Sequence, residues 1–171
     1  MPSSGDSPRP GGTRPVTAHR ARARSVIVAP LLAVSCATPP PTVQLTMDVE
    51  REGARVNISG TTDLADGALL AYELRHEHLA YDPETPRDML FLEGVTTVSD
   101  GRFEAEVDLS SFEPGAIEVW VSFQMRFINS DRTQPSPIVR QFGARGELLE
   151  GTNVSAHDDG KRVELSQTIH W

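Results

Sequence analysis

The stretch Ile117-Glu-Val-Trp-Val-Ser-Phe-Gln-Met-Arg-Phe127 decides the fold, because apolar and polar side chains alternate along its whole length. The residues between the apolar ones are Glu118, Trp120, Ser122, Gln124 and Arg126. Successive side chains of a β-strand point to opposite faces of its sheet, so this alternation turns one face toward a core and the other toward solvent. The stretch therefore predicts a half-buried strand over residues 117–127.

The same alternation recurs elsewhere in the chain. It is found over residues 43–49, 56–58, 70–74, 103–109 and 163–169. Turn-forming sequences separate these segments: Glu52-Gly53, Asp66-Gly67, Asp100-Gly101, Glu113-Pro114-Gly115 and Asp159-Gly160. We interpret Asp66-Gly67 and Asp100-Gly101 as hairpin turns, because glycine accepts positive φ. Short strands joined by turns predict an all-β fold, a single antiparallel β-sandwich over residues 43–171, with no helix.

The N-terminal region follows a different pattern. Five arginines precede the apolar run Ser25–Ser35, which ends at Cys36, the only cysteine of the chain. A run of about 11 residues spans roughly 16 Å as a helix, whereas crossing a bilayer core takes roughly 20 residues. This order of charged, apolar and small residues predicts a signal peptide over residues 1–35, which is removed. The proline-rich residues 36–42 predict a short tether to the domain.

The residues Ala33-Val-Ser-Cys36 resemble the lipobox of bacterial lipoproteins, although Ala33 stands where leucine is commonest. The resemblance implies that the Cys36 thiol carries a diacylglyceryl group and that cleavage makes Cys36 the first residue. The protein is then expected at the extracytoplasmic face of the cell membrane, held there by its N-terminal lipid. The residues alone leave two alternatives open, an ordinary secretory signal and a basic tail on a cytosolic protein.

A second resemblance lies in the domain. The stretch Ser59-Gly-Thr-Thr-Asp-Leu-Ala-Asp-Gly67, followed by Leu69–Tyr72, resembles immunoglobulin-like modules of bacterial surface proteins. Asp100–Phe103 and Pro114-Gly115 fit the same pattern, whereas Ala65 replaces a usual proline. The resemblance covers most of residues 43–152 and implies an immunoglobulin-like β-sandwich. It implies no activity, because such modules carry many functions.

The charge balance limits the partners. The whole chain has a formal net charge of −8, and without the five N-terminal arginines and Asp6 it keeps 11 basic and 23 acidic residues, a net −12. Such a surface repels nucleic acid and anionic lipid headgroups. We therefore expect no nucleic-acid partner, and we expect membrane attachment to depend on the lipid. A single cysteine also excludes an intrachain disulfide.

Two histidines are weak candidates for a metal site. His76 and His78 are two residues apart, so on a strand their imidazoles would share a face and could bind zinc or copper. A third ligand could come from His157, Asp158 or His170. The alternative is that they are ordinary surface histidines near the end of a strand.

Trp120, Gln124 and Arg126 form the candidate contact patch. All three lie on the polar face of the strand predicted over residues 117–127. Tryptophan and arginine are enriched where proteins bind partners. The alternative is that a loop or sheet edge covers this face.

No sequence motif indicates catalysis. The chain lacks a nucleophile elbow, a phosphate-binding loop and a His-Glu-x-x-His sequence. We therefore expect no catalytic residue and no cofactor. The leading hypothesis is a non-catalytic, lipid-anchored protein of the bacterial cell surface, with a binding or structural role and an unknown protein or glycan partner. The alternatives are a metal-binding surface protein that uses His76 and His78, and an enzyme with a scattered site.

Overall fold

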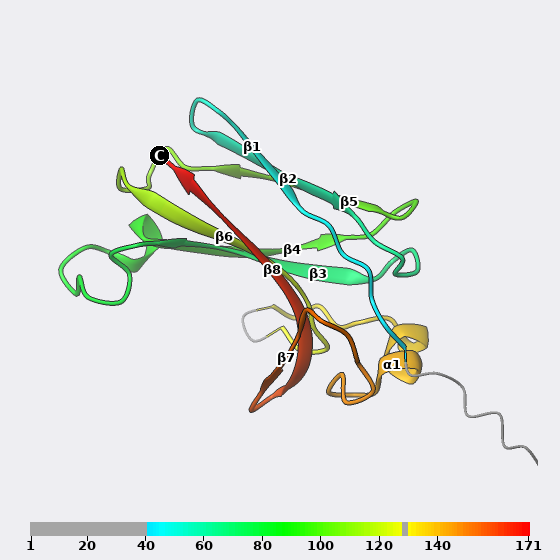
Figure 1. Cartoon of the computed structure of the whole chain (residues 1–171). Helices are drawn as coiled ribbons and strands as arrows, with labels where there is room; N and C mark the ends of the chain where they lie inside the picture. Colours follow the sequence, from blue (N-terminus) through cyan, green and yellow to red (C-terminus); the bar gives the residue numbers. More distant parts are fainter. Residues whose placement is uncertain (1–40, 128–129) are drawn as a thin grey trace, which may run out of the picture. The chain divides into compact units, whose positions relative to one another are not determined.

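The chain folds as the predicted all-β sandwich in the computed structural model, which describes residues 41–127 and 130–171 (Figure 1). One sheet contains β1 (Asp48–Glu52), β2 (Arg55–Thr61) and β5 (Arg102–Asp108), in that order. The other sheet has the order β4 (Phe91–Thr97), β3 (Leu69–His76), β6 (Ala116–Phe123), β8 (Gly160–His170) and β7 (Val154–His157). All neighbouring strands are antiparallel.

The chain passes from one sheet to the other after β2, after β4 and after β5. Two antiparallel sheets joined by such crossings form the β-sandwich that the alternation predicted. Asp66-Gly67 lies in the crossing from β2 to β3, so its interpretation as a hairpin turn was wrong. The Asp66 carboxylate instead accepts a hydrogen bond from the backbone N–H of Asp100 at 2.8 Å. Asp100 and Gly101 form a tight turn with positive φ, but the strands they connect belong to different sheets.

The core lies between the two sheets and consists of the apolar side chains that the alternation had marked. Val56 and Ile58 on β2, Leu70 and Leu74 on β3, and Val119 on β6 are each 0% exposed. Burying one such side chain stabilises the fold by about 1.5–3 kcal/mol. The period of the sequence therefore determines which side chains of these strands are buried.

β6 ends at Phe123, four residues before the predicted end of the strand at Phe127. Beyond Phe123 the buried amide of Gln134 takes the place of a strand partner. Its Oε1 accepts a hydrogen bond from the N–H of Leu69 at 3.0 Å, and its Nε2 donates to the carbonyls of Leu69 and Gln124, each at 2.8 Å. A side-chain amide thus satisfies the backbone of β3 where β6 leaves the sheet.

The prediction of no helix was wrong. The helix α1 (Ser136–Phe142) follows Pro135, has Pro137 in its first turn and ends at Gly143, whose φ is 88°. Ile138 and Phe142 are buried, and the Phe142 ring packs edge-on against Phe123 with centroids 5.1 Å apart. Figure 1 shows α1 at the same end of the domain as β7. Two apolar residues four apart between a proline and a glycine were the available signal.

Three other short elements were not predicted. They are β4, which contains Gly94, the four-residue β7, and the 3₁₀ turn η1 (Arg87–Met89). Each is too short, or too mixed in composition, for its period to stand out.

The first strand also differs from the prediction over residues 43–49, because β1 begins only at Asp48. Before it, the Thr46 side chain accepts a hydrogen bond from the N–H of Thr61 at 2.9 Å, which interrupts the regular ladder. Leu45 pairs with Thr62, and Thr42 pairs with Glu150. Residue 42, which the sequence assigned to the tether, thus forms an isolated bridge outside the two sheets.

Gln134 gives a direct test of this packing. Gln134→Ala leaves buried backbone groups of Leu69 and Gln124 without partners, at a cost of about 1–3 kcal/mol for each group. We expect urea unfolding to show a loss of about 3 kcal/mol or more. Gln134→Glu should destabilise more at pH 7 than at pH 4, because its carboxylate would face two carbonyl oxygens. The exposed Gln44→Ala is the control, and an equal loss from both alanine variants would contradict this account.

Candidate functional site

The outer face of the five-stranded sheet is covered at one end and open at the other. Leu69, Ala71 and Ser122 on this face are 5–6% exposed. They lie near the segment that follows β6, which contacts Leu69 through Gln134 and approaches Ala71 through Phe127. Further along the sheet, Trp120 and its neighbours stay partly exposed. Among the described residues of this sheet face, a partner can reach those of the open part without displacing that segment.

The register of the sheet sets the composition of this open part. Glu93, Glu73, Trp120 and Ser166 lie side by side on four adjacent strands. Arg75 lies two residues from Glu73 on β3, so its side chain points to the same face. Acidic, basic and aromatic side chains therefore lie close together on this part of the sheet.

Arg75 links the carboxylate to the indole. Its Nε donates to Glu73 Oε2 at 2.9 Å, and its guanidinium carbon lies 5.1 Å from the centroid of the Trp120 ring. A cation over an indole at a partly exposed site contributes about 0.5–1 kcal/mol. The Trp120 Nε1–H is covered and has no acceptor among the described residues. The stack therefore holds a large aromatic side chain in one orientation and leaves one donor unpaired.

The three residues predicted as a contact patch do not form one cluster around Trp120. The arginine that covers the indole is Arg75, whereas Arg126 is exposed on the segment after β6. Gln124 also lies past the end of β6, where its carbonyl accepts from Gln134. The sequence indicated the face of Trp120 but missed Arg75, because the pairing of β3 with β6 cannot be read from the alternation alone.

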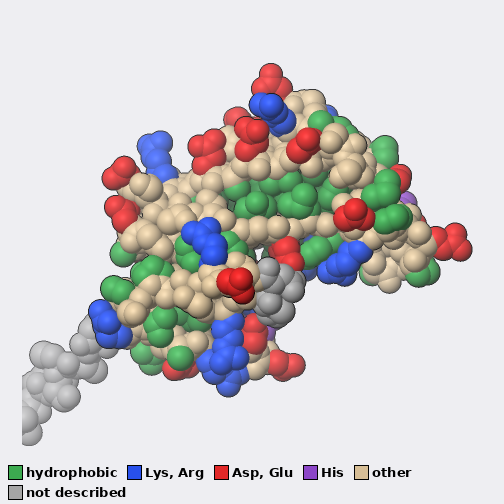
Figure 2. All heavy atoms as spheres, turned by 180° about the vertical axis from the view of Figure 1, so that it is seen from behind, with side chains coloured by type: hydrophobic (Ala, Val, Ile, Leu, Met, Phe, Trp, Pro, Cys, Tyr) green, Lys and Arg blue, Asp and Glu red, His purple; other side chains and the backbone are tan. Residues whose placement is uncertain are grey.

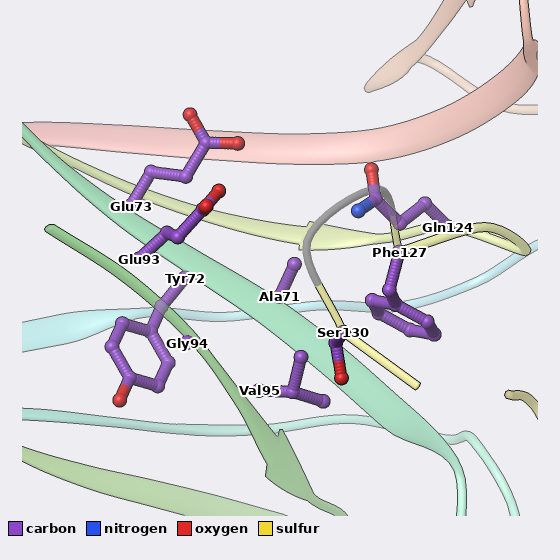
Figure 3. A pocket seen from close by; sticks show the side chains of 9 residues that line it. All are labelled: Ala71, Tyr72, Glu73, Glu93, Gly94, Val95, Gln124, Phe127 and Ser130. Atoms are coloured by element: carbon purple, nitrogen blue, oxygen red, sulfur yellow. The ribbon is translucent and has the colours of Figure 1, made fainter. Parts of the chain in front are cut away.

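Gln124 lines a small hollow beside the stack (Figure 3). Figure 3 shows the Glu73 and Glu93 carboxylates next to each other at one end and Phe127 toward the other, with Tyr72 pointing to the opposite side of β3. The volume is about 70 Å³, whereas pockets for drug-sized ligands measure about 300–1,000 Å³. The hollow has room for a few waters or the end of one side chain, which suits a surface contact.

His76 and His78 are not arranged as a metal site would require. β3 ends at His76, and the backbone N–H of His78 donates to His76 Nδ1 at 3.0 Å. The neutral imidazole of His76 therefore carries its proton on Nε2, so neither nitrogen offers a free lone pair to a metal. Nε2 lies against Gly115, where a Cβ atom would come within 2.4 Å of it.

The other histidines do not complete such a site. His157 lies on β7, 3.1 Å from a carboxylate oxygen of Glu164, and His170 ends β8. Within the part of the chain that the structure describes, no group of three or more His, Cys, Asp or Glu residues is arranged to hold a metal ion.

The strongest acidic surface lies on the other sheet. Figure 2 shows Asp and Glu side chains gathered over the layer that contains β1, β2 and β5. The outward carboxylates are all exposed: Asp48, Glu50, Glu52, Glu104, Glu106 and Asp108. The ion pair between Arg55 and Glu106 is long, at 3.7 Å, and mostly exposed, so it contributes little. Charges on the two edge strands keep the protein soluble and discourage edge pairing.

Cys36, the predicted lipidation site, lies outside the described residues. None of the helices in residues 41–127 and 130–171 has the length and apolar character needed to cross a bilayer.

No protein-family model matches the sequence, and neither a curated protein nor a solved structure matches the chain. Function must therefore come from the chemistry of the site itself.

The loop after His78 has a defined pH dependence. Hydrogen bonds from the Thr85 hydroxyl and from the backbone N–H groups of Thr85 and Glu84 lower the pKa of Asp82 below its ordinary 3.8. A lowered pKa in the folded state means that these bonds are complete above pH 3.8 and are lost as the pH falls through the lower value. We expect the Thr85 amide to lose protection from hydrogen exchange only below that range. Asp82→Ala should remove the protection at every pH, and a Thr85 amide that titrates above pH 5 would contradict the assignment.

Proposed function

We propose that this chain is a non-catalytic, lipid-anchored binding protein outside the cytoplasmic membrane, and that it contacts a protein or glycan through the open outer face of the five-stranded sheet. The observation that carries this proposal is the stack of Arg75 on Trp120, fixed by Glu73. Large aromatic side chains held in one orientation lose little entropy on binding and dominate the energy of many contacts.

The hollow beside the stack supports binding over catalysis. It is too small to enclose a substrate, and its lining includes two carboxylates, an amide, a hydroxyl group and a phenyl ring. A protein side chain or the polar edge of a sugar can meet such groups with hydrogen bonds while an apolar surface covers the indole. The immunoglobulin-like character and the membrane location of the protein belong to the same proposal.

The anchor follows from the order of the N-terminal residues. The apolar run is too short to span a bilayer, and the acidic domain gains nothing from anionic headgroups. Two acyl chains or more on one residue give stable attachment at about 0.8 kcal/mol per buried CH₂. The lipid on Cys36 would thus hold the domain at the membrane, with the proline-rich residues as the connection.

Membrane fractionation tests the anchor. We expect the full chain to sediment with membranes and Cys36→Ala to move to the soluble fraction. Ser35→Ala keeps a small residue before the cysteine and should stay with the membranes. Mass spectrometry of the natural N-terminal peptide should show Cys36 as the first residue with an attached lipid. Membrane retention of Cys36→Ala, or an unmodified Cys36, would refute the anchor.

Binding through the outer face is tested separately. We expect the immobilised protein to retain one component from native envelope proteins or cell-wall glycan fragments, and Trp120→Thr to weaken that binding at least tenfold. Arg75→Met keeps the aliphatic stem but loses the charge, and it should have a smaller effect. Glu106→Gln on the other sheet is the control. If circular dichroism shows folded Trp120→Thr and it binds as well as the unchanged protein, this face is not the contact.

A further inference from the structure

β8 has a backbone edge that no strand covers along most of its length. β8 runs for eleven residues, but β7 pairs only with its first four, Gly160 to Val163. The side of β8 that faces away from β6 is therefore left without a strand partner among the described residues beyond Glu164. A free edge of this kind is a template for pairing with another strand.

The hydrogen-bond pattern identifies which groups are free. Trp171 exchanges two backbone bonds with Gly115, at 2.9 and 3.1 Å, so the odd-numbered residues of β8 bond toward β6. The backbone N–H and C=O groups of the even-numbered residues are directed away from β6. Glu164 confirms this, because its N–H donates to the carbonyl of Asn153 at 3.1 Å. The N–H and C=O groups of Ser166, Thr168 and His170 therefore face outward along the open edge.

This edge lacks the protection that the edges at β1, β4 and β5 carry. β1 and β5 bear outward carboxylates, and β4 is capped by Arg132, which donates to the carbonyl of Val95 at 3.1 Å and to the Thr97 hydroxyl at 2.7 Å. The residues from Ser166 to His170 include no Asp, Glu, Lys, Arg or Pro. They are exposed except Ile169, which is half-buried against the core. This unprotected edge is thus also free of formal charge on a strongly acidic protein.

We propose that this edge pairs with the same edge of a second copy of the chain, antiparallel and centred on Thr168. The free stretch begins after Glu164, whose N–H bonds to Asn153, and β8 ends at His170. Its outward-facing residues are therefore Ser166, Thr168 and His170, with Thr168 in the middle. A twofold axis there places Thr168 opposite Thr168 of the second copy and Ser166 opposite His170. About six backbone hydrogen bonds then join the copies, threonine pairs favourably with threonine, and no formal charges face one another.

A second copy suits this edge better than a foreign strand, because the edge is self-complementary. A twofold contact uses the same residues on both sides, so every free donor meets a free acceptor when the stretch is symmetric about its centre. With the axis normal to the sheet, the two outer faces lie on one side of a continuous sheet. Both copies of Trp120 are then presented in the same direction.

Cysteine cross-linking of the full chain in native membranes tests the proposal. Directly opposite residues in a hydrogen-bonded pair have Cα atoms about 5.5 Å apart, within the range of about 4.4–6.8 Å that a disulfide requires. We expect Thr168→Cys to give a cross-linked species of twice the monomer mass with a mild thiol oxidant. Ser166→Cys alone should give at least tenfold less, because its two copies would lie roughly 14 Å apart. Co-expressed Ser166→Cys and His170→Cys should cross-link to each other.

Sedimentation of the detergent-solubilised chain provides a second measurement. Thr168→Glu places two carboxylates next to each other across the axis, so it should reduce the dimer fraction at least tenfold. The backbone N–H of residue 168 makes no bond to β6, so the fold and its circular dichroism should not change. In the cross-linking experiment, the unsubstituted chain serves as the control, because it shows how much cross-linking Cys36 gives by itself. Four results would overturn the proposal: a maleimide-reactive Thr168→Cys that stays monomeric, equal cross-linking of Ser166→Cys, an adduct with a different protein, or an unchanged dimer fraction in Thr168→Glu.

Discussion

The pairing of β3 with β6 is the interaction on which the rest of the structure depends. It places Leu74 beside Val119 at the centre of the core and, on the opposite face, Glu73 beside Trp120. A shift of one residue in this register would turn the apolar side chains outward and the polar ones inward. The same backbone pairing therefore determines both the stability of the sandwich and the composition of its outer face.

That pairing also explains where the sequence was informative and where it was not. Alternation indicates which face a residue occupies, so the core positions on β2, β3 and β6 and the outer position of Trp120 could be predicted. It contains no information about which strands are neighbours. The contact of Arg75 with Trp120 joins segments far apart in the chain, and it could not be found without the register. The end of β6 was missed for the same reason, since it depends on Gln134, which lies outside any alternating stretch.

The histidines illustrate a different limit. Their spacing was compatible with shared metal binding if both lay on a strand, but β3 ends at His76 and the following amide turns back onto the ring. Burial of His76 beside Gly115 is a packing arrangement in which the glycine leaves room for the imidazole. Two histidines two residues apart can share a metal ion only when the strand continues regularly from one to the other. Here the strand ends at the first of them.

The distribution of charge connects the proposed dimer with the proposed contact face. An acidic protein repels its own copies over most of its surface, so association is least unfavourable where formal charge is absent. The stretch around Thr168 is such a place, and it borders the row that contains Trp120 and Ser166. Pairing there would present two aromatic patches on one side of a single sheet. Two weak contacts that engage a repetitive surface together bind more tightly than either does alone, provided their spacing permits both. The proposed lipid anchor would strengthen this effect, because it would confine the copies to a layer and raise their local concentration.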